Sequence, residues 1–350
     1  MRPVPTAHPL ADLVARATGA PGAAIRVAPR RPLEHQTNRL YDVFVPDRRL
    51  IAKEFVKPDE QATAPLREHR ALELLAGLDV APRPVLLETS PAPPLGPVVV
   101  YEYVEGEMWD RRRPTRAQLG ALARAWLRMQ SIPVERALPS RGHEQTIADL
   151  EPWFGETLRL YGEWAQAAFP PGLRALDLLG PLLDARRPVA AELADIAPVC
   201  CFCRSDPRFA NVIQRPDGRV AMIDWEDSGL RDPAKSVVDL ATHANQEDLL
   251  TPADLRAFLD PYLAELAPLD PHLERRIHLY GAGFPVYWLL GFLRGGVRRA
   301  EAGQLAGWTI NTMAANQRLR RYLARALAWP AEDFADQYGA LGDLAFFPIA

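Results

Sequence analysis

The sequence predicts an α+β fold with a small β-rich N-terminal lobe and a larger, mainly helical C-terminal lobe. Short strand patterns crowd into the first part of the chain, and long helical patterns dominate after residue 105. One hairpin pattern interrupts those helices. Strands grouped ahead of helices are typical of α+β folds. We therefore expect lobes over 1–104 and 105–350, joined near residue 104, with the hairpin segment 200–226 set into the second lobe.

The N-terminal lobe begins with a short helix pattern. Strand patterns on both sides of the Pro-Asp turn at residues 46–49 predict an antiparallel hairpin. An amphipathic helix pattern follows and ends at Gly77, since glycine readily adopts the left-handed conformation beyond a helix. An unbroken apolar run then predicts a buried strand. The expected elements are a helix over 10–17, strands over 40–45 and 50–55, a helix over 65–76 and a strand over 97–101.

The C-terminal lobe is predicted to consist of helices around one hairpin. Pro216-Asp217-Gly218 is a strong turn signal between two apolar runs. Prolines predict a break at Gly180-Pro181 and a kink at Pro285. The expected elements are helices over 116–130, 150–168, 175–193, 252–266, 272–299 and 304–328, and strands over 211–214 and 219–223.

The bulk composition is that of a soluble globular protein. The 350 residues are 48% hydrophobic and 24% charged. The net charge is −3, so the chain lacks the basic excess that would attract nucleic acid or an anionic membrane surface. We expect neither as a partner.

No segment has the pattern of a targeting or membrane-spanning sequence. Residues 1–9 contain no apolar run, and the apolar stretch over 284–293 is too short to cross a bilayer. Cys200, Cys201 and Cys203 are too close together for a disulfide framework and lack the second pair that a zinc site needs. These features favour a cytoplasmic location, and they leave the oligomeric state open.

The most specific chemical pattern consists of Asp206, Asn211 and Asp224. An Asp, an Asn five residues later and a second Asp after a short hairpin is the order found in kinase-type phosphotransferases. The first carboxylate accepts a proton from an attacking hydroxyl. Amide and carboxylate oxygens are the ligands that Mg²⁺ prefers. The pattern predicts a general base at Asp206 and a magnesium site at Asn211 and Asp224.

Each of these residues also has a structural explanation. Ser205 to Arg208 would make a good surface turn, and an Asp after a strand is often a turn residue or a helix N-cap. For Asp206 alone, the surface turn is the better interpretation. The three residues together favour the phosphotransferase, because both their order and their spacing have to agree.

Lys53 is the predicted cation of the N-terminal lobe. Strict alternation places it on one strand face with Ile51 and Phe55, although an edge-strand lysine that opposes aggregation has a similar pattern. Its expected role is to pair the α- and β-phosphates and a helix glutamate. Glu68 lies on the apolar face of the following helix and Glu73 on its more polar face, so Glu68 is the predicted partner.

Two further segments are candidates for nucleotide contacts. Thr37 and Asn38 precede the first hairpin and could donate to phosphate oxygens, although their loop lacks the glycines of a phosphate cradle. Glu102 and Val104 follow the buried strand, where backbone groups could read an adenine edge. The alternative is a plain strand end.

At these residues the chain resembles the aminoglycoside phosphotransferase and choline kinase family, which has the protein-kinase-like two-lobed fold. Asp206, Asn211 and residues 223–226 match the family's His-Gly-Asp-x-x-x-x-Asn stretch and its Ile-Asp-Trp-Glu stretch. Three departures are Arg204-Ser205 in place of His-Gly, Glu34-His35-Gln36 where the family has glycines, and a segment over 232–241 that is longer than the commonest family form. Further matches are Asp232-Pro233, Thr37-Asn38-Arg39, Lys53, Arg67-Glu68 and residues 101–106.

The resemblance implies a kinase that uses Mg²⁺ and ATP, with GTP as an alternative donor. The implied acceptor is a small-molecule hydroxyl compound of aminoglycoside, choline or sugar type. A second hypothesis comes from a different class: a catalytically degenerate, nucleotide-binding pseudokinase that acts as a sensor or scaffold. The Arg204-Ser205 substitution and the glycine-free loop favour that alternative. It is disfavoured by the joint presence of Asp206, Asn211, Asp224 and Lys53.

Overall fold

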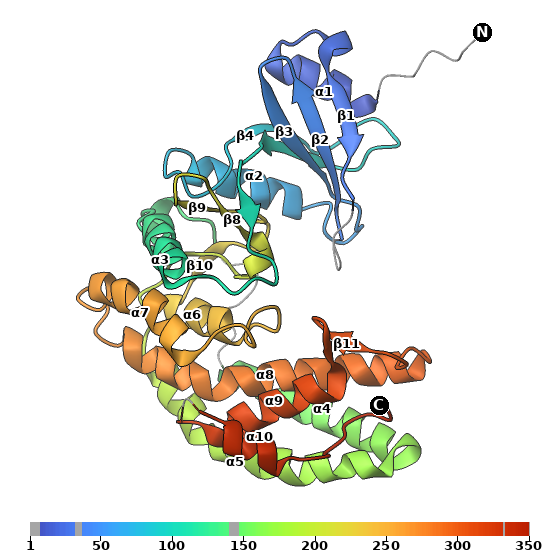
Figure 1. Ribbon diagram of the computed structural model, residues 1–350, viewed down its shortest axis with the longest axis vertical. Coiled ribbons are helices and arrows are strands. Elements are labelled where there is room, and N and C mark those ends of the chain that lie inside the picture. The colour runs from blue at the N-terminus through green and yellow to red at the C-terminus, as the bar shows by residue number, and fades with distance from the viewer. Residues whose placement is uncertain (1–7, 32–36, 140–146, 332, 350) are drawn as a thin grey trace. The chain divides into compact units, whose positions relative to one another are not determined.

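The computed structural model describes residues 8–31, 37–139, 147–331 and 333–349. The loop residues Glu34, His35 and Gln36, and most of the N-terminal segment 1–9, therefore lie outside the described residues. The chain divides into two compact units, residues 1–142 with 200–231, and residues 143–199 with 232–350 (Figure 1). The lobe boundary near residue 104 stays a prediction. All the candidate site residues belong to the first unit.

A five-stranded antiparallel sheet forms one part of the first unit, in the order β1-β2-β3-β5-β4. Its core includes Val43, Leu50 and Val100, which pack with Leu10 and Val14 of the first helix. The elements are α1 (Pro9–Thr18), β1 (Arg26–Pro29), β2 (Arg39–Val45), β3 (Arg48–Glu54), α2 (Ala64–Leu75), β4 (Pro84–Glu88) and β5 (Val98–Glu102).

Two small sheets and a helix complete the first unit. Strand β6 (Glu107–Met108) pairs with β8 (Val212–Gln214), which pairs with β9 (Val220–Met222). Strand β7 (Cys201–Cys203) pairs with β10 (Gly229–Arg231). Helix α3 (Arg116–Gln130) begins at a capping box in which Thr115 and Gln118 satisfy each other's backbone N–H groups. The loop from 204 to 211 and the segment from 223 to 228 are thereby each anchored at both ends by paired strands.

The second unit is mainly helical. Arg276 is completely buried and forms ion pairs with Asp232 (2.9 Å) and Asp270 (2.6 Å), so its charge is compensated on two sides. A second buried arginine, Arg318, pairs with Glu247. The helices are α4 (Ile147–Ala168), α5 (Arg174–Asp195), α6 (Pro233–Thr242), α7 (Pro252–Leu266), α8 (Leu273–Glu301), α9 (Ala315–Ala328) and α10 (Ala335–Ala340). No helix in the described part of the chain has both the length and the apolar character that a bilayer span requires.

The predicted helix over 304–328 is wrong in its first part. Residues 304–314 instead contain a hairpin of β11 (Thr309–Ile310) and β12 (Met313–Ala314), and helix α9 begins only at Ala315. Gly307 has φ of 66°, and Asn311 and Thr312 at the turn have φ of 47° and 73°. These left-handed conformations are incompatible with a continuous helix.

The break predicted at Gly180-Pro181 is also absent. Helix α5 is continuous from Arg174 to Asp195 and contains Pro181 and Pro188 in its interior. Leu179 and Leu182 on either side of that position are buried, so packing of the helix outweighs the lost backbone hydrogen bond.

Candidate active site

The loop between β7 and β8 positions Asp206 and Asn211. Phe209 is fully buried and its ring meets the edge of Trp109 at a centroid distance of 5.2 Å, which anchors the middle of the loop. Residues Phe209–Asn211 form a 3₁₀ turn, and the Asn211 N–H donates to the carbonyl of Arg208 over 3.0 Å. The Ser205 hydroxyl donates to the carbonyl of Asp227. The loop is therefore held by contacts at its start, middle and end.

Asp224 occupies a special backbone conformation directly after β9. Its φ is 69°, in the left-handed region that residues other than glycine rarely adopt. The neighbouring backbone is fixed, because the Ile223 N–H donates to the Asn211 carbonyl (3.0 Å) and the Trp225 indole donates to the Met222 carbonyl (2.8 Å). Strained conformations of this kind persist where the surrounding structure holds them, and they cluster at functional sites.

The three residues of the predicted catalytic pattern lie together. The Asn211 amide Nδ2 is 3.5 Å from Oδ2 of Asp206 and 3.3 Å from Oδ2 of Asp224. The two carboxylate side chains are about a quarter exposed, at 26% and 27%. An amide and two accessible carboxylates from separate parts of the sequence thus meet at the end of the β8–β9 hairpin.

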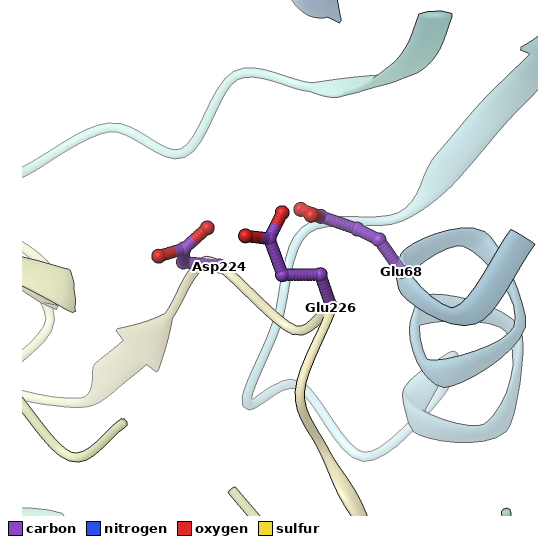
Figure 2. Close-up of side chains that lie close together, drawn as sticks. All are labelled: Glu68, Asp224 and Glu226. Carbon is purple, nitrogen blue, oxygen red and sulfur yellow. The ribbon is translucent and has the colours of Figure 1, made fainter. Parts of the chain in front are cut away.

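Lys53 joins this group from strand β3. Its Nζ lies 2.5 Å from Glu68, 2.5 Å from Oδ1 of Asp224 and 2.8 Å from Glu226. The predicted choice of Glu68 over Glu73 as its partner is confirmed, since Glu68 is 1% exposed whereas Glu73 pairs with Arg70 at the surface. Figure 2 shows the carboxylates of Glu68, Asp224 and Glu226 directed toward one another.

Glu226 was not among the predicted site residues. It comes two positions after Asp224, a spacing that can return a side chain to the same side of an extended segment. Its Oε2 also lies 3.5 Å from the Asn38 amide. That spacing is the signal that the sequence offers for Glu226.

Burial and charge shift the pKa values of these groups in opposite directions. Burial lowers the pKa of Lys53, but Asp224, Glu68 and Glu226 outweigh it and raise that pKa well above its usual value. Burial raises the pKa of Glu68 to about 7 despite the attraction of Lys53. Burial would also raise the pKa of Asp224, but Lys53, Arg204 and Arg208 lower it to about 2. Asp224 is therefore ionised at any physiological pH.

The donor set fits a hard divalent cation at one side of Asp224. Glu68, Asp224 and Glu226 each offer an oxygen within 4.8 Å of the others, but the Lys53 ammonium already lies among them. The second oxygen of Asp224, Oδ2, faces Asn211. An ionised carboxylate beside an amide is a fitting pair for Mg²⁺, which takes one or two carboxylates and keeps its other positions for water and phosphate.

Arg204 occupies the position where a histidine was expected from the family pattern. It is 2% exposed, and its Nε donates to the backbone carbonyl of Asp224 over 3.3 Å. Its guanidinium lies 5.9 Å from the centre of the Trp225 ring. Burial lowers its pKa, while the charges of Asp206 and Asp224 act in the opposite direction. Arg204 is therefore a buried residue that holds the Asp224 backbone in place through this hydrogen bond.

Of the remaining predicted residues, Asn38 contacts this group through Glu226. Thr37 is exposed, whereas Asn38 is 7% exposed and contacts Glu226. The backbone N–H of Glu102 donates to the Arg83 carbonyl over 2.9 Å, and the Glu102 carboxylate pairs with Arg48. Val104 is half-buried and lies two residues beyond the end of β5.

Comparison with known proteins gives one family match and a set of similar structures. The model of the phosphotransferase enzyme family matches residues 30–276. Comparison with curated proteins found no match.

The similar structures share the fold at low sequence identity. Choline kinase LicA from Streptococcus pneumoniae is 19% identical, with 91% of this chain and 98% of that chain covered and a TM-score of 0.59. A putative aminoglycoside phosphotransferase from Ralstonia eutropha is 18% identical, with 91% and 96% covered and a TM-score of 0.59. ADP-bound aminoglycoside phosphotransferase APH(2'')-Ib is 13% identical, with 91% and 97% covered and a TM-score of 0.57.

Proposed function

This chain belongs to the phosphotransferase enzyme family, and we propose that it is an ATP-dependent kinase that transfers the γ-phosphoryl group to a hydroxyl of a small molecule. One observation carries the proposal. The Asn211 amide lies 3.5 Å from Asp206 and 3.3 Å from Asp224, while Lys53 bridges Asp224 and Glu68. A proton acceptor, a metal-binding pair and a phosphate-binding cation are the parts that phosphoryl transfer uses.

Asp206 is the proposed general base. It lies on a loop anchored by Phe209, and its carboxylate is partly exposed, so an acceptor hydroxyl can approach it. A carboxylate that accepts the hydroxyl proton contributes a rate factor of roughly 10²–10⁴. Holding the hydroxyl in line with the phosphorus atom contributes more, up to about 7–11 kcal/mol of the barrier.

Asn211 and Asp224 are the proposed magnesium ligands. Mg²⁺, when bound, neutralises charge on the nucleotide phosphates. The low pKa of Asp224 keeps its carboxylate ionised for this role. The Asn211 Nδ2 donates to Asp224, and the oxygen of the same amide would be the neutral ligand. The left-handed backbone at Asp224 directs one carboxylate oxygen toward Lys53 and the other toward Asn211.

Lys53 and Glu68 are the proposed nucleotide-binding pair of the N-terminal lobe. The Glu68 contact fixes the Lys53 ammonium, which would meet the α- and β-phosphates. Thr37 and Asn38 are proposed to donate to phosphate oxygens. Glu102 and Val104 are proposed to read the adenine edge with backbone groups. The Glu102 N–H is bonded to Arg83, so the Glu102 contact would use its carbonyl oxygen.

The lobe division belongs to the same proposal. We place the N-terminal nucleotide-binding lobe at 1–104 and the C-terminal lobe, with the catalytic hairpin 200–226, at 105–350. Gly106 has a positive φ of 147°, and a Cβ at this position would lie 2.2 Å from the Gln214 carbonyl oxygen. Only glycine fits this backbone path, which comes immediately after the proposed hinge.

The donor and the acceptor are proposed from chemistry and from similar proteins. Two similar structures contain AMP and ADP, which supports an adenine nucleotide, with GTP as the alternative donor. Similar structures are named as kinases of choline and ethanolamine and as phosphotransferases of aminoglycosides and spectinomycin. A small hydroxyl compound of one of these types is the proposed acceptor. The three free cysteines support the reducing cytoplasm as the location.

A screen of hydroxyl compounds for magnesium-dependent ADP release tests this function. The panel should contain choline, ethanolamine, aminoglycosides and simple sugars, with ATP and GTP tested as separate donors. We expect at least one compound to stimulate ADP release above the rate with water alone. Nucleotide binding without ADP release from any compound or from water would favour the pseudokinase alternative instead.

A further inference from the structure

Arg208 contacts both carboxylates at the end of the β8–β9 hairpin and has no role in the function proposed above. Its Nη2 lies 2.5 Å from Oδ2 of Asp206 and 3.6 Å from Oδ2 of Asp224. Its own backbone carbonyl accepts the hydrogen bond from Asn211. The guanidinium is therefore fixed to the same short turn that carries the proposed base and one proposed metal ligand.

The Arg208 side chain is more exposed to solvent than the two other cations that contact Asp224. In the part of the chain that the structure describes, Lys53, Arg204 and Arg208 all contact Asp224. The Lys53 side chain is 5% exposed and is shared among three carboxylates, and Arg204 is 2% exposed beneath the site. The Arg208 side chain is 34% exposed. Of these three, Arg208 has the most exposed side chain.

The contact between Arg208 and Asp206 also has a chemical consequence. A base that is to accept a proton needs an oxygen directed at the incoming hydroxyl, but the arginine engages Oδ2 of Asp206. The arginine guanidinium keeps its positive charge in proteins. The planar guanidinium of Arg208 carries several N–H donors, and their arrangement matches the oxygens of a phosphoryl group. It lies next to the partly exposed carboxylate of the proposed base.

We propose that Arg208 is a catalytic residue that leaves the two carboxylates and donates to the oxygens of the phosphoryl group during transfer. This rests on the proposed function. The acceptor oxygen forms its bond to the γ-phosphorus as the bond from that phosphorus to the departing ADP oxygen breaks. The hydroxyl proton goes to Asp206, and Arg208 keeps its protons throughout. An arginine supplied in this way by the same chain stabilises the charge of the transition state.

The test compares the affinity for Mg-ADP with the affinity for Mg-ADP and aluminium fluoride, a complex that mimics the phosphoryl group in transfer. Mg-ADP and Mg-ADP with aluminium fluoride are titrated into wild-type protein, Arg208→Gln and Arg208→Lys. We expect Arg208→Gln to bind Mg-ADP within about twofold of wild type but to lose on the order of 10²–10³-fold in affinity for the fluoroaluminate complex. Arg208→Lys keeps the charge without the planar fork and should lie between the two.

A matched control is Arg219→Gln on the same hairpin, where the arginine pairs with Asp217 and Asp79 at the turn. It should bind both ligands as wild type does, and thermal unfolding of all three variants shows whether they are folded. Equal fluoroaluminate affinity in Arg208→Gln and wild type would overturn the inference. So would faster turnover in Arg208→Gln, since the arginine would then only block the base. Wild-type protein that binds neither ligand would contradict the proposed function itself, and this inference with it.

Discussion

The Nε of Arg204 donates a hydrogen bond of 3.3 Å to the backbone carbonyl oxygen of Asp224. Arg204 stands where the family pattern has histidine, and Asp224 is a proposed metal ligand. Asp224 holds a left-handed φ of 69°, which costs free energy unless neighbouring groups fix it. Arg204 therefore supports the Asp224 backbone at the position where the family pattern has histidine.

Replacing Arg204 should weaken magnesium-dependent nucleotide binding. Arg204→Met removes the hydrogen bond and one of the charges that lower the pKa of Asp224. We expect about tenfold weaker binding of Mg-ATP, equivalent to about 1.4 kcal/mol, in a magnesium titration at fixed nucleotide. Arg204→His retains a donor and should bind more tightly than Arg204→Met. Equal affinity of Arg204→Met and wild type would show that this contact does not position Asp224.

Asp224→Ala should abolish the stabilisation of the protein by Mg-ATP. The change removes an ionised carboxylate whose Oδ2 faces Asn211, so the metal loses its charged ligand. The measurement is the shift in melting temperature with and without Mg-ATP. Asp217→Ala, at an exposed turn of the same hairpin, is the matched control and should keep the shift. A full shift in the Asp224 variant would rule out its metal-binding role.

The Glu68 carboxyl should make stability depend on pH. Burial raises its pKa from 4.5 to about 7. A carboxyl whose pKa is higher in the folded state stabilises that state fully below its unfolded pKa, and this contribution is lost as the pH rises through the folded pKa. The free energy of unfolding of wild type, relative to Glu68→Gln, should therefore fall between about pH 4.5 and 7.

Urea unfolding at several pH values measures this difference. Glu73→Gln on the same helix is the control, since Glu73 is exposed and pairs with Arg70 at the surface. It should show little change in pH dependence. A constant difference between wild type and Glu68→Gln across the window would contradict the raised pKa.

Much of the fold and site could be predicted from local patterns. The hairpin around residues 46–49, helix 116–130 and the choice of Glu68 all follow from periodicity and turn residues that act over short distances. Asp206, Asn211 and Asp224 were recognisable because their spacing is set by one loop and one short hairpin. The structure brings them together, as that spacing predicted.

The missed features depend on contacts between distant parts of the chain. Strands β1, β4 and β10 were not predicted, since their partners rather than their own patterns define them. The role of Glu226 was missed for the same reason, because this acidic loop residue acquires its partner only when Lys53 of strand β3 is placed beside it.

Gly106→Ala should destabilise the protein more than Gly218→Ala. Both glycines have positive φ, 147° and 82°, but a Cβ at Gly106 would lie 2.2 Å from the Gln214 carbonyl oxygen, whereas nothing lies within 4 Å at Gly218. We expect a loss of roughly 1 kcal/mol at Gly218 from conformation alone and on the order of 3 kcal/mol at Gly106 from conformation and overlap. Chemical unfolding measures both losses. Equal losses would show that the close approach to Gln214 does not constrain the backbone there.

Asp206 is the proposed acceptor of the hydroxyl proton. The most direct measurement combines magnesium-dependent ADP release with Mg-ATP affinity for wild type and Asp206→Asn, using the acceptor that gives the highest wild-type rate. We expect turnover to fall by roughly 10²–10⁴-fold while Mg-ATP affinity is retained, because Asn211, Asp224 and Lys53 are intact. Wild-type turnover in Asp206→Asn would contradict this role of Asp206.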